Sequence, residues 1–91
     1  MNKLELISAV TDKVDLKKKD VEQVVNALLS TVQESLSAGE KVQLVNFGTF
    51  DVRERAERTG VNPRSGKQIK IPAATVPVFK PGKALKDSVN E

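Results

Sequence analysis

Apolar residues recur at every third or fourth position through the first 38 residues, which is the spacing of an amphipathic helix. The stripe of the first segment consists of Leu4, Ile7, Val10 and Val14. It predicts a helix over residues 3–14, with Asn2 as the N-cap and Glu5 completing a capping box. Asp15 and Leu16 interrupt the pattern and predict the end of this helix.

A second and longer apolar stripe follows the first. It consists of Val21, Val24, Val25, Leu28, Leu29, Val32 and Leu36. This stripe predicts a helix over residues 17–38, with Gly39 as its C-cap. The first helix is too short to cover the whole stripe, so we expect a second copy of the chain to cover the rest.

Beyond the second helix, apolar residues alternate with polar ones, as in a half-buried strand. The alternation predicts a strand over residues 41–45, a turn over 46–48 with an unusual backbone conformation at Gly48, and a strand from Thr49. From Arg53 onward the alternation stops, which predicts that the strand leaves the folded body there. Three aromatic residues are expected in the core, namely Phe47, Phe50 and Phe79.

Turn-forming residues are concentrated in residues 60–66, between two strand-like segments. The returning strand is predicted over residues 68–79, where Pro72 and Pro77 restrict it to an edge position. The two segments predict a β-hairpin that is too polar to bury itself and therefore projects as an arm. A short helix over residues 83–90 is predicted to follow. Its inward-facing side chains are expected to be Ala84, Leu85, Ser88 and Val89.

Charge is distributed unevenly along the chain, whose 91 residues carry a net charge of +3 and fit one small domain. Residues 1–50 contain six lysines against seven acids, whereas residues 51–91 contain nine Lys or Arg against five acids. Residues 58–86 contain seven cations and no acid. A projecting basic hairpin is suited to follow a nucleic-acid groove, so a polyanion partner is predicted.

Several function classes are not expected from the composition. The chain has no Cys and no His, which removes disulfides, thiolate chemistry and the commonest general base and metal ligand. Its carboxylates are scattered and no phosphate-binding glycine loop is visible, so an enzyme, a cofactor, a metal or a small-molecule substrate is not expected. No apolar run approaches 18 residues and the first 14 residues are too polar for a signal peptide. A cytoplasmic protein without a membrane partner is therefore expected.

Four motifs together resemble the bacterial histone-like HU family, to which integration host factor is related. They are Gly48-Thr49-Phe50, Arg53-Glu54-Arg55, Asn62-Pro63 and Val76-Pro77-Val78-Phe79-Lys80-Pro81-Gly82-Lys83. The resemblance spans essentially all 91 residues and implies an α+β fold in an intertwined homodimer. The implied parts are a two-helix dimerisation base (1–38), a three-stranded antiparallel sheet with saddle strands (41–52 and 77–82), a protruding β-arm (53–76) and a C-terminal helix (83–90).

The resemblance also implies that the arms enter the minor groove of double-stranded DNA, with Pro63 intercalated between base pairs to bend or kink it. The implied DNA-binding residues are Lys3, Arg53, Arg55, Arg58, Asn62, Pro63, Arg64, Lys67, Lys70, Lys80, Lys83 and Lys86. Binding would be largely independent of sequence, would prefer bent, nicked or flexible DNA, and would compact the nucleoid. Val61 departs from the usual arginine of the family and predicts fewer phosphate contacts near the kink. Lys17 replaces the usual hydroxyl N-cap.

Two other functions are compatible with these residues. The first is a sequence-specific DNA bender of the integration host factor type, which would protect a discrete site in footprinting. The second is a protein-interaction dimer whose arms hold another protein, in which case no duplex would be retained at low salt. On that interpretation Pro63 is an ordinary turn proline and the arginines form a solvated ribbon face.

Overall fold

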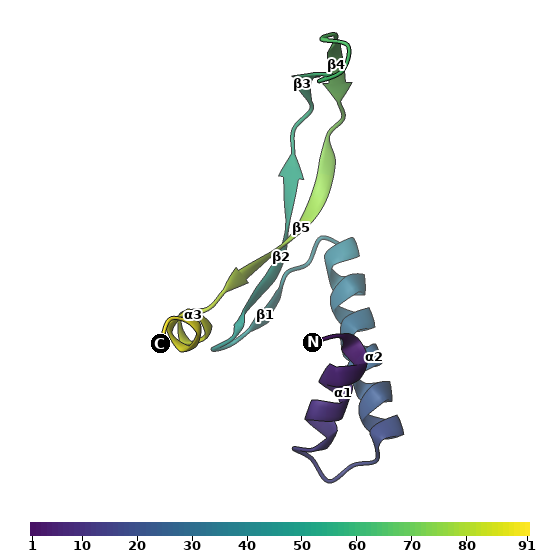
Figure 1. The fold of residues 1–91 in the computed structure, drawn as a ribbon, viewed down its shortest axis with the longest axis vertical. Coiled ribbons are helices and arrows are strands. Elements are labelled where there is room, and N and C mark those ends of the chain that lie inside the picture. The colour runs from purple at the N-terminus through teal and green to yellow at the C-terminus, as the bar shows by residue number, and fades with distance from the viewer. The chain divides into compact units, whose positions relative to one another are not determined.

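Two helices precede the strands and a third follows them in the computed structural model, which describes residues 1–91. The elements are α1 (Lys3–Thr11), α2 (Lys18–Ser37), β1 (Val42–Leu44), β2 (Gly48–Arg55), β3 (Arg58–Val61), β4 (Gln68–Ile71), β5 (Ala74–Pro81) and α3 (Lys83–Val89). They form a helical unit, Met1–Glu34, and a second unit, Ser35–Glu91, which holds all the strands and α3 (Figure 1). This order confirms the predicted α+β class with three helices and an antiparallel sheet.

The first helix begins as the sequence predicts and ends earlier. The Oδ1 atom of Asn2 accepts a 2.9 Å hydrogen bond from the backbone N–H of Glu5, and the Glu5 side chain accepts one from the N–H of Asn2, which completes the capping box. α1 ends at Thr11 rather than at residue 14. Beyond Thr11, backbone bonds of the i to i−3 type, such as Val14 N–H to the Thr11 carbonyl, tighten the chain into a turn.

The second helix lies within one residue of its predicted ends. The carbonyl of Lys17 accepts the first helical bonds, from the N–H groups of Asp20 and Val21. Lys17 thus stands at the N-cap and contributes no hydroxyl or carboxylate to the free amides of the first turn. At the other end Gly39 has a φ of +80° and donates to the carbonyl of Leu36, which confirms the predicted C-cap.

Only two apolar side chains are buried in the single chain. Ile7 of α1 is 1 % exposed and Val21 of α2 is 3 % exposed. The apolar stripe of α2 is only partly covered. Val24, Leu28 and Leu29 are exposed, with Val24 60 % and Leu28 54 % exposed, whereas Val25, Val32 and Leu36 are half-buried. As expected, α1 does not cover the whole stripe within a single chain, and coverage of the rest by a second copy stays a prediction.

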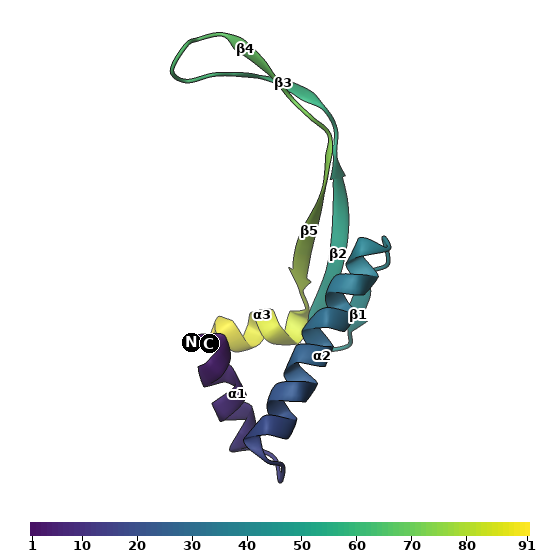
Figure 2. The ribbon, with the colours of Figure 1, turned by 90° about the vertical axis from the view of Figure 1, so that its right-hand side faces the viewer.

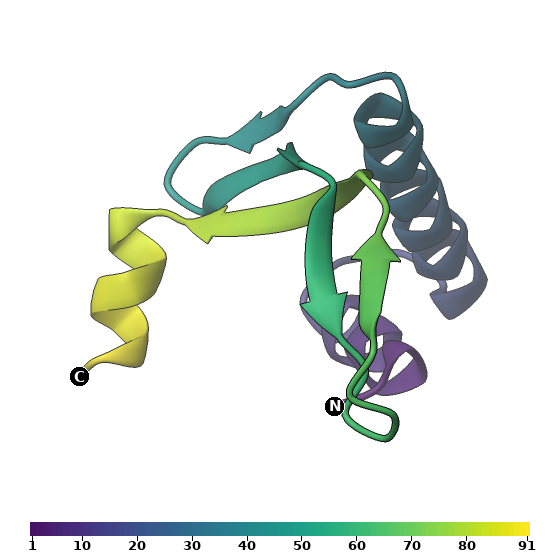
Figure 3. The ribbon, with the colours of Figure 1, turned by 90° about the horizontal axis from the view of Figure 1, so that it is seen from above.

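The second unit contains an antiparallel sheet with strand order β1-β2-β5. β2 pairs with β1 from Gly48 to Phe50 and with β5 along its whole length, from Gly48 opposite Pro81 to Arg55 opposite Ala74. β5 lies at the edge, as its prolines require, and Figure 3 shows α3 following its end. Residues of β2 up to Val52 are buried or half-buried, and those from Arg53 are exposed, which confirms where the strand loses its apolar face.

The hairpin continues beyond this sheet as a two-stranded ribbon of β3 and β4. Pairing stops after Arg55 opposite Ala74 and resumes at Arg58 opposite Ile71, so two residues are skipped on each strand and the register is unchanged. The skipped residues include Pro72, which has no N–H to donate to the ladder. Figure 2 shows the ribbon turning away from the direction of β2 and β5 beyond this interruption.

Gly48 is required by close packing rather than by an unusual backbone conformation, so the predicted reason was wrong. The positive φ in this turn, 69°, belongs to Asn46. A Cβ atom at Gly48 would lie 2.6 Å from Cζ of Phe79 and 2.8 Å from the carbonyl oxygen of Lys80. The Phe79 ring also contacts Phe50, with ring centroids 4.8 Å apart.

Two further groups of residues predicted to be core are not fully covered within the single chain. Phe47 and Phe79 are partly exposed, although their rings pack against each other with centroids 5.7 Å apart. In α3 only Leu85 is half-buried, whereas Ala84, Ser88 and Val89 are exposed. These apolar surfaces have no partner element within one chain.

Gly48→Ala is expected to destabilise the fold, because its methyl group would require the Phe79 ring or the β5 backbone to move. Overpacking of this kind costs about 1–3 kcal/mol, and chemical unfolding followed by circular dichroism would measure it. Ser88→Ala, on the exposed surface of α3, is the control and should change the unfolding free energy by less than about 0.5 kcal/mol. Equal stability of Gly48→Ala and the unmodified chain would contradict this account of Gly48.

Candidate nucleic-acid interface

Asn62 organises the tip of the hairpin. Its backbone N–H donates to the carbonyl of Lys67 at 2.8 Å, and its carbonyl accepts from the N–H of Gly66 at 2.9 Å. Its side-chain Oδ1 accepts from the N–H of Arg64 at 2.9 Å, which forms an Asx turn around Pro63. Asn62 was predicted to contact DNA. The structure gives it a clear role within the tip, and DNA contact through its remaining amide group stays a prediction.

The tip holds Pro63 outward. Pro63 is exposed and lies in the four-residue loop that Asn62 and Lys67 close. On the returning side Gly66 has a φ of +69°, a conformation that favours glycine, and nothing lies within 4 Å of where its Cβ would be. Figure 2 shows that the hairpin ends in the loop between β3 and β4. Pro63 gives this loop an exposed apolar ring without an N–H.

The arginines of the arm have no acidic partner in the chain. Arg53, Arg55, Arg58 and Arg64 are all exposed. The ion pairs in the structure involve lysines instead. The guanidinium groups thus remain free to donate to an external anion, and Lys67 near the tip is likewise exposed and unpaired.

Three lysines that were predicted to bind DNA have carboxylate partners in the structure. The N–O distances are 3.0 Å for Lys70–Glu57, 3.8 Å for Lys80–Asp51 and 3.9 Å for Lys83–Asp87. The Lys80–Asp51 pair joins β5 and β2 diagonally, and the Lys70–Glu57 pair joins β4 to the unpaired segment before β3. Only the pairing of the two limbs shows that these side chains are adjacent. The third is an i, i+4 pair on α3, which helical spacing could have revealed.

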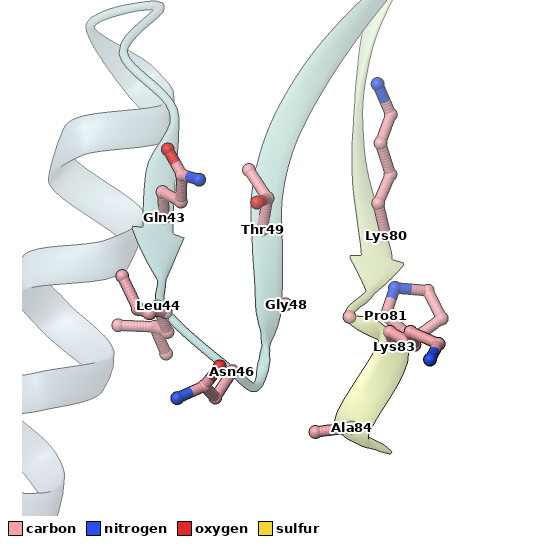
Figure 4. A pocket seen from close by; sticks show the side chains of 11 residues that line it. Gln43, Leu44, Asn46, Gly48, Thr49, Lys80, Pro81, Lys83 and Ala84 are labelled. Atoms are coloured by element: carbon pink, nitrogen blue, oxygen red, sulfur yellow. The ribbon is translucent and has the colours of Figure 1, made fainter. Parts of the chain in front are cut away.

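A shallow groove of about 340 Å³ crosses the end of the sheet opposite to the arm. Figure 4 shows Gln43 on one side of it, Thr49 in the middle, and Lys80 and Lys83 on the other side. The two lysines were predicted to be DNA contacts of the saddle. Gln43 and Thr49 were not, because their types and positions carried no signal until the sheet brought β1, β2 and β5 together.

A second open groove, of about 540 Å³, lies at the interruption of the arm ladder. It is lined by Glu54, Arg55, Ala56, Ala73, Ala74 and Thr75. Except for Glu54 and Arg55, the lining side chains are small.

The predicted site residues therefore fall into three places. The arm carries Arg53, Arg55, Arg58, Asn62, Pro63, Arg64, Lys67 and Lys70. The end of β5 and α3 carry Lys80, Lys83 and Lys86. Lys3 is the first residue of α1 in the helical unit, and its use as a DNA contact stays a prediction.

Neither a metal centre nor a membrane span is found in the structure. No three His, Cys, Asp or Glu side chains are grouped so that they could hold a metal ion. No helix combines the length and apolar character needed to cross a membrane. The chemistry offered by the arm and the sheet end is that of exposed cations, amides and one apolar ring.

Comparison with known proteins agrees with this arrangement. The family model "Bacterial DNA-binding protein" matches residues 1–90. "DNA-binding protein HU" of Clostridium pasteurianum is 58 % identical over 91 residues, which is all of both chains. The protein of the same name from Staphylococcus aureus (strain COL) is 57 % identical over 89 residues, 98 % of this chain and 99 % of the relative.

Solved structures show the same similarity. The "Anabaena HU-DNA cocrystal structure" superimposes with a TM-score of 0.92 at 45 % identity, covering 98 % of this chain and 97 % of that one. HU from Thermotoga maritima superimposes with a TM-score of 0.71 at 43 % identity, covering 98 % of each chain. With a family match over residues 1–90 and relatives above 55 % identity over nearly their full length, the chain belongs to the HU family of bacterial DNA-binding proteins.

Proposed function

We propose that this protein is a histone-like architectural protein that binds double-stranded DNA through the minor groove, largely without sequence specificity. It bends or kinks the DNA by inserting Pro63 between base pairs, and in this way compacts or stabilises the nucleoid in the cytoplasm. One observation carries the proposal: an exposed hairpin whose arginines have no internal partner ends in an outward-facing proline. The HU relative from Anabaena, which has the same fold, has been crystallised with DNA.

Pro63 has the properties that an intercalating wedge requires. Its ring is compact and apolar, and the absence of an N–H means that entry into a base stack leaves no donor without a partner. The bonds of Asn62 to Arg64, Gly66 and Lys67 hold the tip closed, so little conformational entropy remains to be lost on insertion. Unstacking costs a few kcal/mol per base step and is offset by the backbone contacts that bent DNA permits. Bent, nicked or flexible DNA is therefore the preferred partner.

The free arginines account for affinity without sequence specificity. Arg53, Arg55 and Arg58 follow one limb of the arm, and guanidinium groups suit the narrow, electronegative minor groove. The minor groove distinguishes little beyond A·T from G·C pairs, so amide contacts there read almost no sequence. Lys67 and Lys70 on the other limb, and Lys80, Lys83, Lys86 and Lys3 outside the arm, add contacts to phosphates.

A homodimer is the form in which we expect this protein to act. The exposed part of the α2 stripe includes Val24, Leu28 and Leu29, and a chain of this size cannot be stable with only two buried apolar side chains. A second copy supplies an identical stripe, which makes the interface self-complementary. Two copies also supply two arms, so one DNA duplex can be held at two points.

DNA affinity should fall steeply with salt, because phosphate contacts release condensed counterions. Between about 50 and 200 mM salt we expect a loss of at least about a hundredfold, measured by fluorescence anisotropy with a labelled nicked duplex. Arg55→Ala or Arg58→Ala should weaken binding and reduce the slope of log affinity against log salt by about one per arm. Lys13→Ala, which removes an exposed cation outside the predicted site, is the control. Nearly constant affinity over this salt range would contradict the proposal.

Pro63→Ala should reduce DNA bending more than DNA affinity, because the wedge acts on base stacking whereas the cations supply attraction. Energy transfer between dyes at the two ends of a duplex would measure the bend, and the same sample would give the affinity. We expect a clear loss of bending with less than about a tenfold change in affinity, that is, under about 1.4 kcal/mol. Pro77→Ala, an edge-strand proline far from the tip in sequence, is the matched control. Unchanged bending by Pro63→Ala would show that Pro63 is not the wedge.

Leu28→Glu should disrupt the homodimer, because it places a charge in the apolar stripe that a second copy is expected to cover. Sedimentation velocity should show a monomer or an unfolded chain at concentrations where the unmodified protein is dimeric. Asn26→Glu adds the same charge at an exposed polar position of α2 and should leave the dimer intact. A folded dimer of Leu28→Glu would place the interface elsewhere.

A further inference from the structure

The junction between the two parts of the arm has no backbone hydrogen bonds of its own. Ala56 and Glu57 on one limb, and Pro72 and Ala73 on the other, lie between the paired segments and take part in no backbone bond across the arm. The ladder on either side has the same register, so the gap inserts no extra residue. Side chains must therefore supply whatever specific contact joins the limbs at this junction.

One ion pair supplies such a contact. Nζ of Lys70 lies 3.0 Å from Oε1 of Glu57, and both side chains are more than half exposed. Lys70 is opposite Thr59 in the ladder, so it reaches diagonally from β4 to Glu57 in the unpaired segment. The pair thus joins the outer part of the arm, the β3–β4 ribbon (the distal ribbon), to the junction. It is also the one ion pair of the arm beyond residue 53.

We propose that Glu57 is a positioning residue that competes with DNA phosphate for Lys70. In free protein the carboxylate holds the ammonium group against the junction. When the arm enters DNA, a phosphate oxygen replaces the carboxylate as the partner of Lys70, and the ion pair across the junction is released. This inference rests on the proposed function, since it requires that the arm contact phosphate.

The competition has a defined effect on binding. Part of the attraction of Lys70 for DNA is used to break its bond to Glu57, so Lys70 contributes less than an unpaired cation such as Lys67. The arm therefore binds undistorted DNA less tightly than its count of cations suggests. Release of the pair also removes the specific contact between the limbs at the junction, which leaves the distal ribbon free to reorient along the groove.

Glu54 provides the comparison that separates this competition from simple charge repulsion. Glu54 is an exposed carboxylate on the same limb, three residues before Glu57, and it has no ion-pair partner. Replacing either residue with glutamine removes one exposed negative charge from the same limb of the arm. Only replacement of Glu57 also frees a lysine.

The test is a double-mutant cycle on DNA affinity, with Glu57→Gln, Lys70→Gln and the double variant in the full dimeric protein. Affinity for a nicked duplex is measured at about 50 mM salt, and circular dichroism confirms that each variant is folded. Exposed ion pairs of this kind correspond to about a twofold to fivefold change in an equilibrium constant. Lys70→Gln should weaken DNA binding in both backgrounds. The fold-change that it causes should be about twofold to fivefold larger, per arm, in the Glu57→Gln variant than in the unmodified protein. Glu57→Gln should tighten binding more than Glu54→Gln does.

Each outcome of the cycle is informative. Equal effects of Lys70→Gln in the two backgrounds, with Arg55→Ala still weakening binding, would overturn the competition and leave the proposed function intact. Equal tightening by Glu57→Gln and Glu54→Gln would do the same, since it would reduce the role of Glu57 to general repulsion. Failure of the unmodified protein to retain any duplex would instead overturn the proposed function itself.

Discussion

The scarcity of buried apolar surface in one chain is the constraint on which the rest of this structure depends. Ile7 and Val21 are the buried apolar residues, while the stripe of α2, the edges of the Phe47 and Phe79 rings and one side of α3 are open to solvent. Conformational entropy opposes folding by roughly 1–2 kcal/mol per ordered residue, and so small a core cannot offset it. Because one chain buries too little apolar surface, we propose that a second copy covers the exposed apolar residues in a homodimer.

The arm obeys the opposite constraint, because it must remain ordered without a core. Its backbone bonds form a ladder in constant register, broken where Pro72 cannot donate, and its tip is closed by three bonds of Asn62. Because hydrogen bonds rather than apolar contacts stabilise it, the arm can be exposed along both faces. Its exposed arginines can therefore contact an external anion, whereas the arginines of a buried hairpin could not.

Carboxylates of the chain itself neutralise part of the positive charge of the lysines. The arginines are unpaired, whereas Lys70, Lys80 and Lys83 have carboxylates within 4 Å. Exposed pairs such as these contribute little to stability, about 0.2–1 kcal/mol where measured, so their consequence for this protein is in binding rather than folding. In our proposal, this partial neutralisation of the lysines moderates the affinity of the protein for DNA.

The sequence by itself determined the helices, the hairpin, its basic character and its exposed tip, because hydrophobic period, capping and turn residues act over a few neighbouring positions. The capping box at Asn2 and the edge position of Pro77 were predictable for that reason. Only the tertiary structure decided which residues far apart in the chain meet. The contact of Gly48 with Phe79 and the pair of Glu57 with Lys70 depend on strand register and on the break at Pro72, which local pattern does not specify.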